Sequence, residues 1–453
     1  MGQVGDKGWG AASWAEGKGV RERTTEICYQ LIPSQFPWLP PESSFPSHPR
    51  PHAAAAAAAA AAVDPLSVVQ AAPPLRSERK DTHAPNLSVS TEKGGGGDKM
   101  NRRFVHLVLC NAIAGRSGFT MHSISSASLF NPSSWSAPNR CAEEVGHTVA
   151  MEHSELPSPA MSFYRPCLGN KRTWMEFMRL GQSSSSKVAD NIISTDHEGR
   201  TIAYDPTSGA VGTMPSLHAP KSFPVSLSIG DSLYVINSNP LHANCFEALI
   251  HGFPPDNMGN EDWYWHSLPT PSYVYEPTGF EEDEDGYQNP HAIRAYTVVG
   301  DSRLWYSTIG VGTYCFETTT RVWHKVGDWS MPFRGYVEYV AEHGLWFGLS
   351  SDDDENKLCM SNLETKDKPV VLKSWQYLTS PQDWIPYGSY LVPLGSSKFC
   401  IARIFATAFE HDTRFIDSTF AVFTGVEVVM TGGAGLEMIL HKSIRLKLQW
   451  REA

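Results

Sequence analysis

The sequence lacks the patterns that would place this protein in a membrane or in the secretory pathway. No apolar run reaches the length of about eighteen residues that suggests a transmembrane helix. The first residues, Met1–Asp6, are charged and glycine-rich, and they lack the apolar segment of a secretory signal. We therefore expect a cytoplasmic or nuclear protein with no membrane attachment.

Closely spaced cysteines are also missing. The eight cysteines are scattered, and no two of them have the C-x-x-C spacing. A structural zinc site needs close pairs of ligands, so this spacing argues against one. Several cysteines lie in apolar runs, where a free thiol behaves as a small hydrophobic group. We expect buried, reduced thiols at Cys28, Cys110, Cys141, Cys167, Cys245, Cys315, Cys359 and Cys400.

The usual catalytic and metal-binding motifs do not occur. Neither H-E-x-x-H nor G-x-S-x-G is present among the 453 residues. Two acidic runs, Glu281–Asp285 and Asp352–Glu355, lack the alternating order of a calcium loop and are interpreted as solvated loop tips. His266 and His324 each follow a tryptophan and are expected to face solvent on a strand. The sequence predicts no catalytic, cofactor-binding or metal-binding residue and no cofactor.

Positive charge is scarce in most of the chain. The net charge is −11, and the first hundred residues contain ten basic and ten acidic groups. The whole excess therefore lies in residues 101–453, where 27 basic groups face 38 acidic ones. Nucleic-acid binding depends on clustered Lys and Arg that attract phosphates, so we expect no nucleic-acid partner.

Residues 1–99 differ from the rest in composition. They contain the proline-rich stretch Pro33–Pro51, ten alanines at Ala53–Ala62 and four glycines at Gly94–Gly97. Such a segment has no sustained apolar period and buries too little surface to offset its ordering entropy. We predict a disordered extension over 1–99, a folded domain over 100–448 and a short tail over 449–453.

A repeat begins at about Met161 and continues to the end of the folded part. Each unit reads as an apolar strand, a tight polar or glycine turn, an apolar-aromatic strand and two further short strands. The same kind of turn precedes Leu and an aromatic residue three times, at Gly230-Asp231, Gly300-Asp301 and Glu342-His343-Gly344. From Trp265 to Trp323 there are 58 residues, and from Trp323 to Trp375 there are 52.

This spacing predicts the fold. A period of roughly 50 residues with four strands is typical of kelch-type propeller blades, and each blade needs its neighbour to cover an apolar face. We expect an all-β, kelch-like β-propeller of five or six four-stranded blades, with Trp265, Trp323 and Trp346 mostly buried. A plain β-sandwich is the alternative.

The folded part also resembles a known family. It is similar to a plant, chiefly grass, family of kelch-like proteins catalogued only as a domain of unknown function, number sixteen sixty-eight. The phrases that carry the resemblance are Arg102–Val105, Asp196–Asp205, Ala219–Lys221, Phe246–Leu249, Trp323–Phe333, Leu345–Ser350, Gly395–Ile401 and Phe420–Val428. The resemblance implies a fold and carries no catalytic residues.

The sequence favours an interaction module over an enzyme. The repeated scaffold, the variable loops and the absence of a catalytic set suggest a scaffold or adaptor that binds another protein. The alternative is an enzyme or small-molecule binder that uses the central channel of the propeller. A paralogue under little functional constraint is a third possibility.

Overall fold

The structure is a computed structural model of the 453-residue chain. It describes residues 29–31, 104–113, 116–130, 151–164, 174–181, 191–240, 244–255, 259–276, 289–351, 356–365, 367–409, 412–431 and 435–448. The chain divides into two units, one combining Met1–Pro37 with Lys99–Ala453 and the other comprising Trp38–Asp98. The second unit, most of the extension predicted over 1–99 and the tail predicted over 449–453 lie outside the described residues.

The described chain consists of β-strands joined by turns, with two short 3-10 helices, η1 (Ser126–Leu129) and η2 (Ser272–Tyr275). Its first four-stranded antiparallel sheet has the order β1-β2-β3-β5. These strands are β1 (Tyr29–Leu31), β2 (Phe104–Ile113), β3 (Arg116–Ser125) and β5 (Met161–Tyr164). No helix in the described part is long and apolar enough to cross a membrane.

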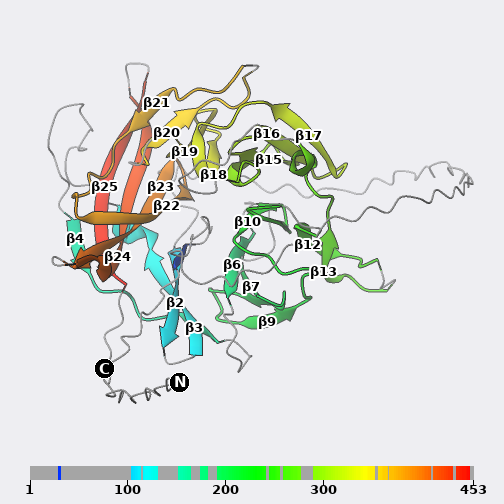
Figure 1. The fold of residues 1–453 in the computed structure, drawn as a ribbon, viewed down its shortest axis with the longest axis horizontal. Helices are drawn as coiled ribbons and strands as arrows, with labels where there is room; N and C mark the ends of the chain where they lie inside the picture. The colour runs from blue at the N-terminus through cyan, green and yellow to red at the C-terminus, as the bar shows by residue number, and fades with distance from the viewer. Residues whose placement is uncertain are drawn as a thin grey trace, which may run out of the picture. The chain divides into compact units, whose positions relative to one another are not determined.

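Two further four-stranded sheets follow in chain order (Figure 1). The second sheet contains β6 (Met175–Leu180), β7 (Asn191–Asp196), β8 (Thr201–Tyr204) and β9 (Val211–Met214). The third contains β10 (Pro224–Ile229), β11 (Ser232–Asn237), β12 (Phe246–Gly252) and β13 (Asp262–Ser267). In both sheets each strand pairs with the next one along the chain, as in a meander.

The fourth and fifth sheets are joined at their first strands. The fourth contains β14 (Ile293–Val299), β15 (Arg303–Thr308), β16 (Thr313–Glu317) and β17 (Val322–Gly327). The fifth contains β18 (Phe333–Val340), β19 (Leu345–Ser350), β20 (Leu358–Ser361) and β21 (Lys373–Trp375). Strands β14 and β18 pair in parallel through Ala295↔Gly335 and Tyr296↔Tyr336, which links the two sheets edge to edge.

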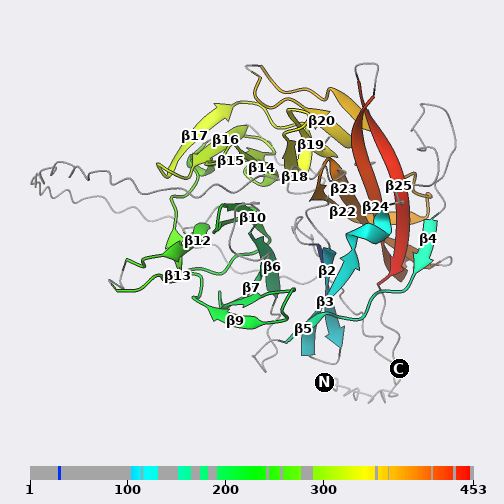
Figure 2. The same cartoon turned by 180° about the vertical axis from the view of Figure 1, so that it is seen from behind.

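The sixth sheet is built from much longer strands. It contains β22 (Trp384–Gly395), β23 (Lys398–Phe409), β24 (Asp412–Thr431) and β25 (Gly435–Lys447). A fifth strand, β4 (Met151–Ser154), pairs in parallel with the outer edge of β25 (Figure 2). Because β24 has 20 residues while the strands of the second to fifth sheets have 3 to 8, part of the sixth sheet extends beyond its neighbours.

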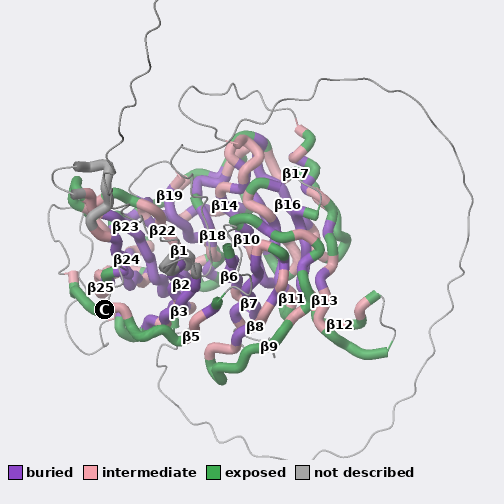
Figure 3. The backbone as a smooth tube through the Cα atoms, turned by 60° about the horizontal axis from the view of Figure 1, so that its bottom comes forward, coloured by how far each residue is buried: buried purple, intermediate pink, exposed green. Residues whose placement is uncertain are grey.

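The hydrophobic core lies between successive sheets. Five hydrophobic clusters each contain residues of two successive sheets, from the first and second to the fifth and sixth. Within them, the ring centres of Phe119 and Phe177 are 5.6 Å apart, and those of Phe246 and Phe316 are 4.8 Å apart. A sixth cluster returns from the last sheet to the first, because Val105 of β2 packs with Cys400 of β23. Figure 3 shows that burial is concentrated along the strands.

This cyclic order of contacts makes the domain a β-propeller of six blades and confirms the predicted β-propeller. The first five blades have four strands each, and the sixth has β4 as an additional strand. The predicted turns are also confirmed. Gly230, Gly300 and Gly344 all adopt positive φ values, a conformation that glycine reaches without steric cost.

The expected start of the repeat needs correction. The repeat was expected to begin at about Met161, but the first blade precedes that point and is assembled from separated segments. Its first strand is β1, which pairs with β2 through Tyr29↔Leu109, Gln30↔Val108 and Leu31↔Leu107. Three residues of the segment 1–99 therefore belong to the fold, because the inner edge of β2 needs a hydrogen-bonding partner.

Candidate interaction site around the loop between β9 and β10

The loop of residues 215–223 connects the outer strand of the second blade to the inner strand of the third. It contains an ion pair between Lys221 and Glu247 of β12, in which both side chains have 0% exposure. The Lys221 ammonium group also donates a hydrogen bond of 2.6 Å to the carbonyl oxygen of Ala219. A buried charge is tolerated only when it is paired and hydrogen-bonded, and here the lysine meets both conditions.

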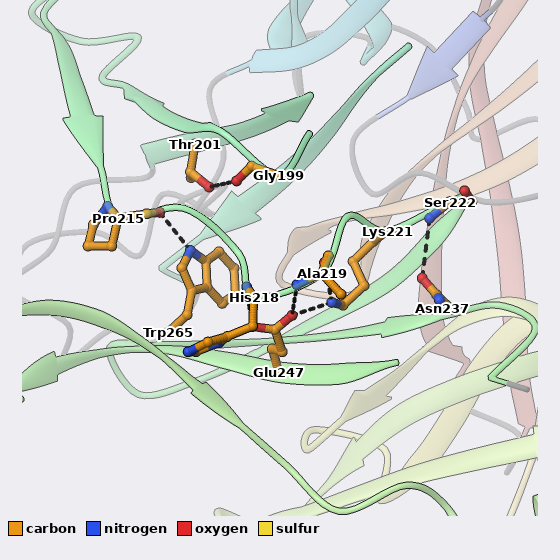
Figure 4. A network of polar contacts seen from close by, with 10 residues as sticks. All are labelled: Gly199, Thr201, Pro215, His218, Ala219, Lys221, Ser222, Asn237, Glu247 and Trp265. Carbon is orange, nitrogen blue, oxygen red and sulfur yellow. Dashed lines mark hydrogen bonds and ion pairs between the residues drawn. The ribbon is translucent and has the colours of Figure 1, made fainter. Parts of the chain in front are cut away.

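Glu247 is held from several sides. Its carboxylate accepts hydrogen bonds from the backbone N–H groups of His218 at 3.0 Å and Ala219 at 3.2 Å, and from Nδ1 of His218 at 2.6 Å (Figure 4). Burial alone raises the pKa of Glu247, but the hydrogen bond and charge of Lys221, together with the hydrogen bonds from His218, outweigh burial and lower the pKa. Burial lowers the pKa of Lys221, and Glu247 offsets part of this effect. The carboxylate therefore fixes the course of the loop.

Phe223 ends the loop in an unusual conformation. Its φ of 47° lies in the left-handed region, which a bulky residue adopts at a cost of about 1–3 kcal/mol. Its backbone N–H donates to Oε1 of the buried Glu176 at 3.1 Å, and the N–H of Ser222 donates to Oδ1 of Asn237 at 3.2 Å. Surrounding contacts thus hold the strained backbone in place, yet the Phe223 side chain remains exposed, with 45% relative exposure for the residue.

A second exposed aromatic residue contacts the same loop. Trp174 immediately precedes β6, is 41% exposed, and its Nε1 donates to the carbonyl oxygen of Lys221 at 3.4 Å. Phe223 immediately precedes β10, and β6 and β10 are neighbouring strands. We call Trp174 and Phe223 the aromatic ledge. It is a half-exposed pair of rings on adjacent blades, supported by buried carboxylates.

The outer margin of the site carries imidazole and guanidinium groups. The side chain of His218 is half-exposed above Glu247. On β13, Nε2 of His266 lies 2.7 Å from Nη1 of Arg321. Burial lowers the pKa of His266, and the charges of Arg321 and His218 lower it further.

Tryptophans of the outer strands connect neighbouring blades. Nε1 of Trp265 donates to the carbonyl oxygen of Pro215 at 2.9 Å, and Nε1 of Trp323 donates to that of Pro269 at the same distance. Trp265 and Trp346 are buried, as predicted. Trp323 has intermediate exposure and packs against the rings of Phe246, Tyr273 and Phe316, so it is less buried than the other two tryptophans. His324 is exposed as expected, whereas His266 is partly buried against Arg321.

Comparisons with known proteins show the family of the chain. A family model described as "Protein of unknown function (DUF1668)" matches residues 102–446. The chain belongs to this family. A solved structure, the WD40 domain of SCAP from fission yeast, is similar with 9% identity and a TM-score of 0.28, over 77% of this chain and 75% of that one. No curated protein matches.

Some of the other predicted features of this DUF1668 domain lie in the described residues and some lie outside them. Of the cysteines, Cys110, Cys245, Cys315, Cys359 and Cys400 are free and buried, and the other three lie outside the described residues. The acidic runs Glu281–Asp285 and Asp352–Glu355 also lie outside them. Within the described ranges, no three His, Cys, Asp or Glu side chains are grouped so that they could hold a metal ion.

Sequence reasoning missed the site of this DUF1668 domain. Two phrases of the family resemblance, Ala219–Lys221 and Phe246–Leu249, contain the two members of the buried ion pair. Glu247 stands inside the apolar run Phe246–Ile250, and a lone carboxylate in such a strand indicates a buried partner. The role of Phe223 could not be predicted in this way, because nothing in the sequence indicates its positive φ.

Proposed function

We propose that this DUF1668 domain is a protein-interaction module, a scaffold or adaptor without catalytic activity, and that the aromatic ledge is part of its binding surface. One observation carries the proposal: Phe223 is held half-exposed in a strained conformation above a fully buried ion pair. Strain of this kind is concentrated at functional sites, where the surrounding structure fixes it.

The chemistry of the ledge suits a protein partner. Large aromatic side chains dominate the binding energy of protein interfaces, provided that a rigid support has already removed most of their conformational freedom. Trp174 is restrained by its bond to Lys221, and Phe223 by the bond from its N–H to Glu176. The Trp174 ring and the Phe223 backbone are thus both held in place.

Charge indicates the kind of segment that would bind. Residues 101–453 have 38 acidic and 27 basic groups. Long-range attraction therefore favours a positively charged segment, and the ledge supplies contacts for an apolar residue within it. We propose a basic protein segment with an apolar anchor as the partner, and no nucleic-acid or membrane partner.

Several finer properties are part of the same proposal. The phrases quoted above support a plant, chiefly grass, origin and a kelch-like repeat. The free, buried cysteines support a cytoplasmic or nuclear location, because reducing compartments preserve free thiols. The lack of an assembled catalytic set in the described part supports a non-enzymatic role.

The proposal is tested with the full chain and an array of short synthetic peptides. The array varies net charge and the presence of one Leu, Phe or Pro anchor, and binding of the best peptide is measured by fluorescence polarisation. We expect basic peptides with an apolar anchor to bind better than acidic ones. The Phe223→Gly and Trp174→Ser variants should each weaken that binding at least tenfold.

The control is an exposed aromatic residue at the other end of the same sheet. Phe253 follows the end of β12, whereas Phe223 precedes β10, and the antiparallel register places these positions at opposite ends. The Phe253→Ser variant should bind like the unmodified protein. Equal binding by Phe223→Gly and the unmodified chain, or equal loss in Phe253→Ser, would contradict the proposal.

A further inference from the structure

A second candidate site lies in the part of the sixth sheet that extends beyond its neighbours. Here β4, β24 and β25 border a groove of about 440 Å³, within the range typical of ligand pockets. Phe420 lines it, together with the polar residues His153, Ser154, Glu155, Ser418, Thr419, Arg445 and Lys447. We call it the basic groove, and it is separate from the aromatic ledge.

Strand pairing brings the basic side chains together. The parallel register of β4 with β25 places His153 opposite Arg445, and the antiparallel register of β24 with β25 places Phe420 opposite Lys447. Arg445 and Lys447 are two residues apart on one strand, so their side chains share a face of the sheet. Three nitrogen-bearing side chains thus lie on one face next to the Phe420 ring.

Arg445 is positioned by aromatic stacking and not by an acid. Its guanidinium carbon lies 3.6 Å from the centre of the Phe420 ring and 5.0 Å from that of Trp384. Within the described residues, no hydrogen bond or ion pair to Arg445 is formed, and Asp383 acts only as a nearby charge. Stacking fixes the plane of the guanidinium group and leaves the N–H donors at its edge available.

The other lining groups match this pattern. Lys447 and His153 are exposed, and neither is bonded to another side chain in the described ranges. Thr419 is buried, and its hydroxyl group has no hydrogen-bond partner there. Glu155 is the single acidic group of the lining. The groove therefore carries more basic than acidic side chains, although the chain as a whole has a net charge of −11.

We propose that the basic groove binds a phosphate monoester group. A guanidinium group with free edge donors forms charge-assisted, bidentate hydrogen bonds with a phosphate, and Lys447 and His153 reach the same group from neighbouring positions. A phosphate monoester offers three acceptor oxygens and nearly two negative charges, which matches three donor side chains better than a carboxylate does. The ester is part of a small metabolite or of a phosphorylated protein side chain.

The test is a titration of phosphate probes into the full chain, with binding measured by isothermal calorimetry. The probes are inorganic phosphate, phosphoserine, serine, and a phosphoserine peptide with its unphosphorylated form. We expect phosphoserine to saturate one site and serine not to bind. Binding should weaken as NaCl is raised from about 0.05 to 0.5 M, because screening shortens the reach of the charges.

Variants connect the binding to the groove. Lys447→Gln changes an exposed residue and leaves the fold intact, so a loss of at least fivefold in affinity can be assigned to the lost charge. Arg445→Gln should lose at least tenfold, and Arg445→Lys should recover only part of that. The control Lys373→Gln neutralises a different exposed lysine, on β21, and should bind like the unmodified chain.

Each outcome decides the proposal. Tighter binding of the phosphopeptide than of phosphoserine supports a phosphorylated protein as the source of the ester, and equal binding supports a small metabolite. Failure of every phosphate probe to saturate, equal binding of serine and phosphoserine, or unchanged affinity in Lys447→Gln would overturn the proposal. These results are independent of binding at the aromatic ledge.

Discussion

The ammonium group of Lys221 and the carboxylate of Glu247 form an ion pair with no exposure of either side chain, across a sequence separation of 26 residues. The pair joins the loop before β10 to the third strand of the same blade. It therefore fixes the loop that ends in Phe223, and it makes the stability of this blade sensitive to both charges.

Removing one member of the pair should strongly destabilise the domain. Lys221→Met or Glu247→Gln leaves an uncompensated buried group, and we expect each to lower the free energy of unfolding by about 3–5 kcal/mol. The double variant Lys221→Met/Glu247→Gln should recover much of that loss, because it removes both charges. Urea denaturation of the four proteins measures this, and additive losses would show that the two groups act independently.

The pair should also make stability depend on pH in the acidic range. The pKa of Glu247 is lowered in the folded state, so its stabilising contribution is complete above its usual value of 4.5 and is lost as the pH falls through the lowered value. Unfolding midpoints in urea should thus decrease more steeply below pH 4.5 for the unmodified chain than for Glu247→Gln. Parallel curves for the two proteins would contradict the assigned shift.

Phe223→Gly should stabilise the domain while weakening peptide binding. Glycine adopts a φ of 47° without steric cost, so relief of strain should raise the free energy of unfolding by about 1 kcal/mol. Phe223→Ala keeps the strain and loses the ring, and serves as the comparison. If glycine and alanine give the same denaturant midpoint, the backbone at this position is not strained.

Trp265, Trp323 and Trp346 should differ in their contributions to stability. Trp265→Ala removes a buried ring and should cost about 3–5 kcal/mol, and Trp346→Ala about the same. Trp323→Ala should cost less, because this ring is only partly buried. Trp265→Phe keeps most of the ring but loses the hydrogen bond to Pro215, and should cost about 1–2 kcal/mol. Equal costs for Trp265→Ala and Trp323→Ala in chemical denaturation would contradict this order.

The contribution of β1 can be separated from that of the rest of the extension. A chain lacking residues 1–28 retains β1 and should unfold at the same denaturant concentration as the full chain. A chain lacking residues 1–31 leaves three positions of β2 unpaired, and should lose about 1–3 kcal/mol. If both truncated chains match the full chain, residues 1–31 are dispensable for folding and the pairing of β1 adds no stability.

The repeat predicted the fold well because each blade from the second to the fifth is one continuous meander with its turn glycines in register. The first blade was missed because its strands come from residues 29–31, 104–125 and 161–164, and no local pattern spans such gaps. The extra length of the sixth sheet was not predicted, for a related reason. Residues 412–418 have few apolar side chains, and pairing with β23 keeps them extended.

The two candidate sites depend on features that sequence patterns do not encode. Phe223 is an ordinary phenylalanine in the sequence, and its positive φ follows from hydrogen bonds to Glu176 and from the buried pair. His153 and Arg445 are nearly 300 positions apart, and only the parallel pairing of β4 with β25 places them opposite each other. In both cases long-range contacts determine the chemistry.

The contact between the first and last blades also constrains how the chain folds during synthesis. Val105 and Leu107 pack with Ile444 and Leu446, so the apolar surface of β2 has no lasting cover until nearly the whole domain has been translated. Contacts between such distant residues slow folding, and an uncovered strand surface favours aggregation in the meantime. The domain should therefore reach its native state only after the C-terminal blade has left the ribosome. It should also depend on chaperones more than a protein in which every sheet packs only against sheets close in sequence.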